Sequence, residues 1–229
     1  LQPELAVVVA FRMLPEVVWS LPPKGTINLH ASLLPKYRGA APINWAIING
    51  EKVTGLTTFF IQKEIDTGDI ILQREMEIGP DETAGELHDR MMVAGAELVV
   101  ETVKLIESGD YDLKKQDDSL ATPAPKIFHE TCQIDWDQPV DRVYDFIRGL
   151  SPYPAAWTTF QGKQLDIYRC KKEPAKHDLE PGTWQTDGKK WLRFAARDGF
   201  IYATEVKLSG KRKMAIDELL RGLRLDDGR

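Results

Sequence analysis

Residues 27–42 read INLHASLLPKYRGAAP, and this stretch decides the fold of the first half of the chain. Its first four residues follow the pattern of a short β-strand. Successive side chains of a strand point to opposite faces, so Asn28 and His30 share one face while Ile27 and Leu29 share the other. An amide and an imidazole therefore lie side by side near the end of a strand. Open α/β sheets place their ligand crevice at this end of their strands.

The neighbouring sequence predicts an α/β domain over residues 1–113. Residues 5–10 form an apolar run typical of a buried parallel strand. The elements predicted after residue 41 are a helix at 42–48, strands at 54–62 and 69–77, and a helix that follows the capping box Thr83–Glu86 and runs to about Ser108. Strands that alternate with helices indicate a Rossmann-like sheet. Because the chain starts inside a buried strand, we expect this sheet to be partial, with an exposed half that oligomerises or aggregates.

A change of pattern separates a second domain. Residues 114–130 are polar and contain prolines, which favours an interdomain linker. Residues 131–229 then show short β-rich segments separated by turns such as Asp187-Gly188. The predicted elements are a helix at 140–149, strands at 164–170, 182–185, 191–195 and 200–206, and a helix at 215–223. This pattern predicts a mainly β domain compatible with a small barrel.

Charge and composition narrow the class of protein. The 229-residue chain has a net charge of −5, but residues 131–229 carry 18 Lys and Arg against 15 Asp and Glu, a balance of +3. Residues 1–130 carry 12 against 20, a balance of −8. This asymmetry permits a nucleic-acid partner for the second domain. No apolar run approaches the roughly 20 residues that span a bilayer, and the first ten residues lack a signal-peptide pattern. We expect a cytoplasmic protein with no membrane partner, in which Cys132 and Cys170 are reduced.

A second polar segment, residues 65–69, reads Ile-Asp-Thr-Gly-Asp and predicts a turn that brings a carboxylate to the same crevice. Acyl transfer to an amine needs a donor for the developing oxyanion and a group that handles the amine proton. Asn28 and His30 suit the first task. Asp66 suits the second, because it can also orient the imidazole. Each motif by itself is more often structural, so the spacing alone leaves this function open.

Other catalytic arrangements fit the residues less well. A triad of Ser32, His30 and Asp66 lacks the Gly-x-Ser-x-Gly elbow that would expose the hydroxyl group. An aspartic protease needs two Asp-Thr-Gly carboxylates on β-domains. A metal is not expected, because the four histidines show no zinc-ligand spacing.

Residues 27–42 resemble the signature of the folate-dependent formyltransferases. The Arg-Gly-Ala-Ala-Pro ending is similar to the members that formylate methionyl-tRNA, and residues 66–69 are similar to the family's second motif. Residues 134–136, 151–157 and 181–183 resemble the C-terminal domain of those members. The resemblance therefore covers nearly the whole chain, although members of the family begin with further strands and helices.

The resemblance implies that a formyl group passes from 10-formyltetrahydrofolate to the amino group of initiator methionyl-tRNA for translation initiation. It implies Asn28, His30 and Asp66 as catalytic residues and residues 131–229 as an OB-like, tRNA-binding domain. The residues it implies for folate binding are Arg12, Met13, Leu14, Ser32, Leu33, Leu34, Pro35 and Ile65. Basic residues that could contact tRNA phosphates, or be only a solvated surface, are Lys189, Lys190, Lys211, Arg212 and Lys213.

Three alternatives stay open at this point. The acceptor could be a different amine, such as glycinamide ribonucleotide or a nucleotide-linked amino sugar, although Trp136, Pro152 and Trp157 favour tRNA. The chain could be a noncatalytic RNA-binding module, which the presence of all three catalytic candidates disfavours. The same three residues could also hydrolyse the formyl donor instead of transferring its formyl group.

Overall fold

The computed structural model describes residues 2–9 and 14–223. The chain divides into two compact units. The first unit comprises Leu1–Ala46, Glu51–Pro80 and Glu86–Lys126, and the second comprises Ile47–Gly50, Asp81–Gly85 and Ile127–Arg229. Within the described residues, no helix has the length and apolar character needed to cross a membrane.

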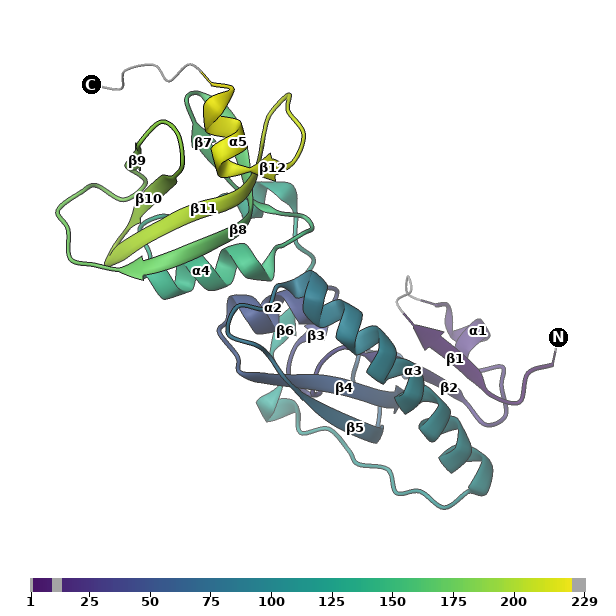
Figure 1. Cartoon of the computed structure of the whole chain (residues 1–229). Helices are drawn as coiled ribbons and strands as arrows, with labels where there is room; N and C mark the ends of the chain where they lie inside the picture. The colour runs from purple at the N-terminus through teal and green to yellow at the C-terminus, as the bar shows by residue number, and fades with distance from the viewer. Residues whose placement is uncertain (1, 10–13, 224–229) are drawn as a thin grey trace. The chain divides into compact units, whose positions relative to one another are not determined.

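The first unit is built on a four-stranded sheet in the order β1-β2-β4-β5 (Figure 1). The strands are β1 (Ala6–Val9), β2 (Thr26–His30), β4 (Val53–Phe60) and β5 (Ile70–Glu77). β1 lies parallel to β2, whereas β4 is antiparallel to both of its neighbours. The predicted α/β class is confirmed, and β2, which carries Asn28 and His30, lies inside the sheet.

The long helix α3 (Ala84–Ser108) packs against this sheet. Leu87, Met91 and Leu98 are buried at helical spacing. A side chain at Gly95 would come within 2.8 Å of a methyl group of Leu29 on β2, so the glycine allows the helix to approach the sheet closely. Two shorter helices, α1 (Glu16–Trp19) and α2 (Pro42–Ile48), precede α3 in the chain.

Much of the predicted linker, residues 114–130, is bonded into the first unit. Strand β6 (Pro123–Ala124) pairs in parallel with β3 (Arg38–Gly39), which lies in the loop that follows β2. Lys114 forms an antiparallel bridge with Ile70 at the start of β5. This segment therefore supports the loop after β2, and the first unit extends to Lys126.

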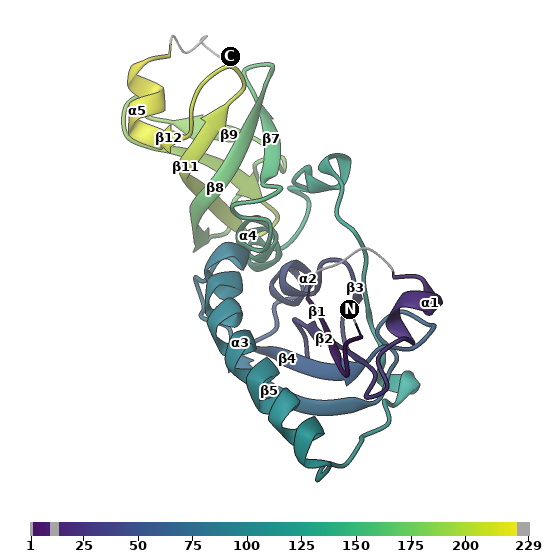
Figure 2. The same ribbon diagram turned by 90° about the vertical axis from the view of Figure 1, so that its right-hand side faces the viewer.

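The second unit contains a six-stranded sheet in the order β7-β8-β11-β10-β9, with β12 beside β11 (Figure 1 and Figure 2). All its strand pairs are antiparallel, and register shifts between Ala203 and Val206 mark a bulge that bends β11. The sheet forms a β half-barrel, so the mainly β class is confirmed. Its strands are β7 (Ala156–Phe160), β8 (Lys163–Pro174), β9 (Trp184–Thr186), β10 (Leu192–Ala196), β11 (Gly199–Leu208) and β12 (Met214–Ala215).

Helix α4 (Val140–Gly149) explains why Asp81–Gly85 belongs to the second unit. The Tyr144 hydroxyl group donates to Asp81 Oδ1 at 2.7 Å, and burial together with this bond raises the pKa of Tyr144. The buried Arg148 donates from Nη1 to the carbonyl oxygen of Glu82 at 2.9 Å. A terminal helix, α5 (Ile216–Arg221), follows β12, close to the helix predicted at 215–223.

Candidate functional site

The first unit contains a cleft of ≈ 930 Å³ at the C-terminal end of β2. Asn28 and His30 reach it from β2, and Asp66 reaches it from the loop between β4 and β5. The three catalytic candidates therefore line one cavity. Apolar side chains that line the same cavity include Leu14, Trp19, Ile43, Phe59, Ile61 and Ile65.

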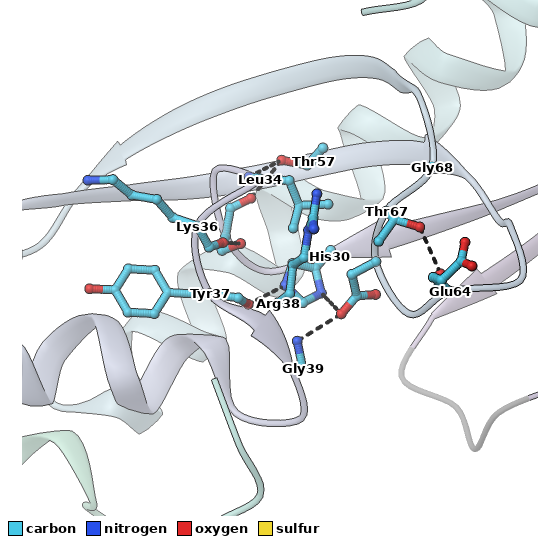
Figure 3. A network of polar contacts seen from close by, with 12 residues as sticks. His30, Leu34, Lys36, Tyr37, Arg38, Gly39, Thr57, Glu64, Thr67 and Gly68 are labelled. Carbon is cyan, nitrogen blue, oxygen red and sulfur yellow. Dashed lines mark hydrogen bonds and ion pairs between the residues drawn. The ribbon is translucent and has the colours of Figure 1, made fainter. Parts of the chain in front are cut away.

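The imidazole of His30 is buried and held by the backbone of the following loop. Its Nε2–H donates to the carbonyl oxygen of Tyr37, with 2.8 Å between the heavy atoms (Figure 3). Tyr37 itself has a positive φ of 62°, a conformation that non-glycine residues seldom adopt. Because a carbonyl oxygen only accepts hydrogen bonds, the ring carries its hydrogen on Nε2, and Nδ1 is the nitrogen left for chemistry.

The Asp66 carboxylate lies beside that second nitrogen. Oδ2 is 3.6 Å from His30 Nδ1, and it also accepts a hydrogen bond from the Gly39 amide at 2.8 Å. The side chain is 10% exposed, so the contact with the imidazole is largely shielded from bulk water. Asp66 also has a positive φ of 57°, which the turn of residues 66–69 imposes. The pair can therefore share or relay a proton in the cleft.

Asn28 supplies the third polar group. Its residue is 7% exposed, and its Oδ1 has no hydrogen-bond partner among the described residues. Leaving a buried polar atom unpaired costs about 1–3 kcal/mol, so the amide is available to a bound molecule. The amide can present either its oxygen or its NH₂ group to that molecule.

Two of the residues expected to bind folate, Leu14 and Ile65, line the cleft. Arg12 and Met13 lie outside the described residues. The third group, Ser32 to Pro35, does not appear among the described residues that line this cavity. Ser32 is fully buried and its hydroxyl group donates to the carbonyl oxygen of Lys36 at 2.6 Å, while Leu34 is 3% exposed.

Thr57 on β4 holds this inward-facing loop in place. Its hydroxyl group donates to the carbonyl oxygen of Ser32 at 2.7 Å and accepts from the amide of Leu34 at 3.2 Å. Gln73 Nε2 donates to the same hydroxyl oxygen at 3.0 Å and to the carbonyl oxygen of Leu34 at 2.9 Å. The segment 32–35 therefore forms the base of the loop that carries Tyr37 and Gly39.

We expect Thr57→Val to lower the free energy of unfolding by about 2 kcal/mol, because valine has the same shape but leaves buried backbone groups unpaired. Urea unfolding followed by circular dichroism measures the change. Thr58→Val is the matched control. The Thr58 hydroxyl group bonds to the hydroxyl group of Thr102 at 2.8 Å, whereas that of Thr57 bonds to the loop. An equal or larger loss in the control would contradict a special role for Thr57.

The basic residues predicted to contact phosphate are all exposed. Lys213 Nζ forms an ion pair with Glu205 at 3.0 Å, and Arg212 pairs with Glu218. Lys189 and Lys190 donate their backbone amides to Asp187, and these bonds lower the pKa of that carboxyl group. The side chains of Lys189 and Lys190 are exposed on the second unit. Within the described part of the chain, no cluster of three His, Cys, Asp or Glu residues could hold a metal ion.

Sequence reasoning did not select three residues that shape the site, namely Tyr37, Gly39 and Gln116. Tyr37 and Gly39 act through backbone atoms, which residue type does not reveal. A Cβ atom at Gly39 would lie 2.6 Å from the carbonyl oxygen of Ala124, and its φ is +126°, so glycine is required there. Gln116 lies in the segment predicted as a linker, and nothing local marks it.

Models of known protein families match both parts of the chain. A family model described as formyl transferase matches residues 1–103, and one described as the formyl transferase C-terminal domain matches residues 126–224. Among solved structures, HypX from Aquifex aeolicus in complex with tetrahydrofolic acid has a TM-score of 0.72 at 22% identity, covering 95% of this chain and 38% of that one. The methionyl-tRNA formyltransferase from Clostridium thermocellum has a TM-score of 0.63 at 22% identity, covering 90% and 78%. At these identities the likeness shows the fold alone.

Other relatives share a higher sequence identity with this chain than these solved structures do. The methionyl-tRNA formyltransferase of Bacteroides thetaiotaomicron is 52% identical over 234 aligned positions, which cover 98% of this chain and 73% of that protein. The methionyl-tRNA formyltransferase of Flavobacterium johnsoniae is 49% identical over 232 positions, covering 99% and 73%. The chain therefore belongs to the methionyl-tRNA formyltransferase family.

Proposed function

We propose that the intact protein transfers a formyl group from 10-formyltetrahydrofolate to the α-amino group of initiator methionyl-tRNA, in the cytoplasm, for translation initiation. The observation that carries the proposal is that Asn28, His30 and Asp66 line one cleft, in which the imidazole and the carboxylate lie 3.6 Å apart. Family membership supports the choice of the two substrates, and the geometry supports the roles below.

Stabilisation of the developing oxyanion is the first task of the site. When the amine attacks the formyl carbon, the formyl oxygen gains negative charge. Asn28 can donate an N–H to that oxygen, and His30 can donate from Nδ1 when it is protonated, because its Nε2 is already bonded to Tyr37. Donors that are fixed before the reaction stabilise such charge without reorganising.

Proton transfer is the second task. The attacking amine must lose a proton, and N10 of tetrahydrofolate must gain one as its bond to the formyl carbon breaks. Asp66 can accept the proton, because only one of its oxygens is held by Gly39 and the carboxylate lies beside His30. The protonated carboxyl group or imidazole can then return the proton to the leaving nitrogen.

The remaining cleft suits a pterin-containing donor. Its walls include the apolar residues Leu14, Ile65 and Trp19, and flat heterocycles bind mainly in such apolar cavities with a few polar groups. The unpaired Oδ1 of Asn28 offers one such polar group. We propose that Ser32 to Pro35 serve folate binding indirectly, by fixing the loop through Thr57.

A comparison of acceptors tests this function. We expect the intact protein to transfer labelled formyl from 10-formyltetrahydrofolate to methionyl-tRNA with kcat/KM of order 10⁴ M⁻¹s⁻¹ or higher. Glycinamide ribonucleotide and a nucleotide-linked amino sugar should react at least about 1,000-fold more slowly, because they cannot use a tRNA-binding domain.

Each other outcome selects a different function. A faster rate on one of the small amines would overturn the acceptor. Formate release that does not depend on any amine would show a hydrolase. Tight tRNA binding with no binding of the formyl donor would show a noncatalytic RNA-binding module.

A further inference from the structure

The side chain of Gln116 joins the two loops that form the catalytic end of the cleft. Its Nε2 donates to the carbonyl oxygens of Asp66 and Gly68, each at 2.8 Å. Its Oε1 accepts from Arg38 at 3.1 Å to Nε and 2.7 Å to Nη2. The residue is only 7% exposed, so these bonds form out of contact with bulk water. One buried amide thus links the loop after β2 to the turn between β4 and β5.

That turn needs such support, because Asp66 is held in an uncommon backbone conformation. A non-glycine residue with a φ of 57° persists only where its surroundings hold it. Gln116 binds the carbonyl groups on both sides of Thr67, so it fixes the backbone from which the Asp66 side chain projects. The Gly39 amide fixes the carboxylate itself from the neighbouring loop.

The amide group is the side chain that this position requires. Both of its hydrogens face carbonyl oxygens, and its oxygen faces a guanidinium group, so donor and acceptor are used together. Glutamate would keep the acceptor for Arg38 but would place an oxygen against two carbonyl oxygens. Methionine has a similar length but would remove every one of these hydrogen bonds.

We propose that Gln116 is a positioning residue for formyl transfer, which holds the Asp66 carboxylate at the reacting centre by bonding the turn of Asp66 and Gly68 to Arg38. This inference rests on the role proposed above for Asp66. Gln116 acts through the backbone of Asp66 and not through contact with either substrate. Its loss should therefore lower kcat more than it changes substrate binding.

Steady-state kinetics of the intact protein test the proposal with Gln116→Glu and Gln116→Met. We expect kcat to fall about 100-fold in both variants, as is typical when a reacting group moves by about 1 Å, with the KM of each substrate changed less than about threefold. Asp118→Asn is the matched control, since Asp118 is the exposed ion-pair partner of Arg38 at 2.8 Å and lies on the same segment. Its kcat should stay within about twofold of wild type.

A double-mutant cycle with Asp66→Asn separates positioning from general support of the fold. We expect Gln116→Met to lower kcat less than about fivefold in the Asp66→Asn background, because the group it positions is already disabled. The same 100-fold loss in both backgrounds would overturn the proposal. Thermal unfolding checks each variant, and if Gln116→Glu unfolds below the assay temperature, the uncharged Gln116→Met carries the test.

The outcomes also separate this inference from the proposed function. If Asp66→Asn keeps the kcat of wild type, the role of Asp66 itself fails. If Asp66→Asn is impaired while a folded Gln116 variant keeps kcat within about threefold of wild type, only the positioning role of Gln116 fails.

Discussion

His30→Ala is expected to lower kcat for formyl transfer about 1,000-fold, within the range typical of a lost proton-transfer or oxyanion-stabilising group. The substitution removes the one imidazole that lies 3.6 Å from the Asp66 carboxylate in the cleft. It also removes the hydrogen bond that Nε2 donates to the Tyr37 carbonyl oxygen. Because these groups act on the transition state, the KM of methionyl-tRNA should change far less than kcat.

A second histidine provides the control for this experiment. His88 lies at the edge of the same cleft, but its side chain is 62% exposed and its ring contacts Asp89 on the same helix. We expect His88→Ala to keep kcat within about threefold of wild type, as exposed side chains outside the reacting groups usually do. Steady-state kinetics with 10-formyltetrahydrofolate and methionyl-tRNA measure both variants. Equal turnover in His30→Ala and His88→Ala would contradict the catalytic role of His30.

Gly68→Ala is expected to lower the free energy of unfolding by about 3 kcal/mol and to reduce activity with it, at the upper end of what overpacking usually costs. A Cβ atom at Gly68 would lie 1.7 Å from the backbone carbonyl oxygen of Phe60, which cannot move away as a flexible side chain could. The turn that carries Asp66 would have to shift. Urea unfolding measures the stability, and the transfer assay measures the effect on catalysis.

The matched control for that experiment is Gly109→Ala. Gly109 has a positive φ of 74° at the end of α3, and nothing lies within 4 Å of the position of an added Cβ atom. We therefore expect only the strain of a left-handed alanine, about 1 kcal/mol, with normal kcat. If Gly68→Ala cost no more than Gly109→Ala, the close approach of the turn to β4 would be wrong.

The local sequence pattern predicted the elements of the fold where the hydrophobic periodicity agrees with the turn and capping residues. The alternation of residues 27–30 placed Asn28 and His30 on one face of β2, and both line the cleft. The helix predicted at 140–149 begins and ends at those residues. Strand β7 was not predicted, because Ala156–Phe160 follows a proline-rich stretch and carries little alternation.

Contacts between distant segments were beyond such reasoning. Residues 114–126 look like a polar linker locally, yet they pair with β3 and supply Gln116 to the turn of Asp66. Residues 32–35, whose role in folate binding stays a prediction, give a second example. The structure directs Ser32 and Leu34 toward Thr57, a contact set by the pairing of β2 with β4. Residue type predicted the chemistry of the site, whereas its support depends on tertiary structure.

The most direct test of the catalytic cluster is the single-turnover rate of formyl transfer to methionyl-tRNA, measured with the intact protein and excess enzyme. This measurement reports the chemical step apart from substrate binding and product release. With both substrates bound, we predict fast transfer in the wild-type protein and a rate lower by at least about 100-fold in Asp66→Ala, because the carboxylate beside His30 is lost. If folded Asp66→Ala had the same single-turnover rate as the wild-type protein, the catalytic role of Asp66 would be contradicted.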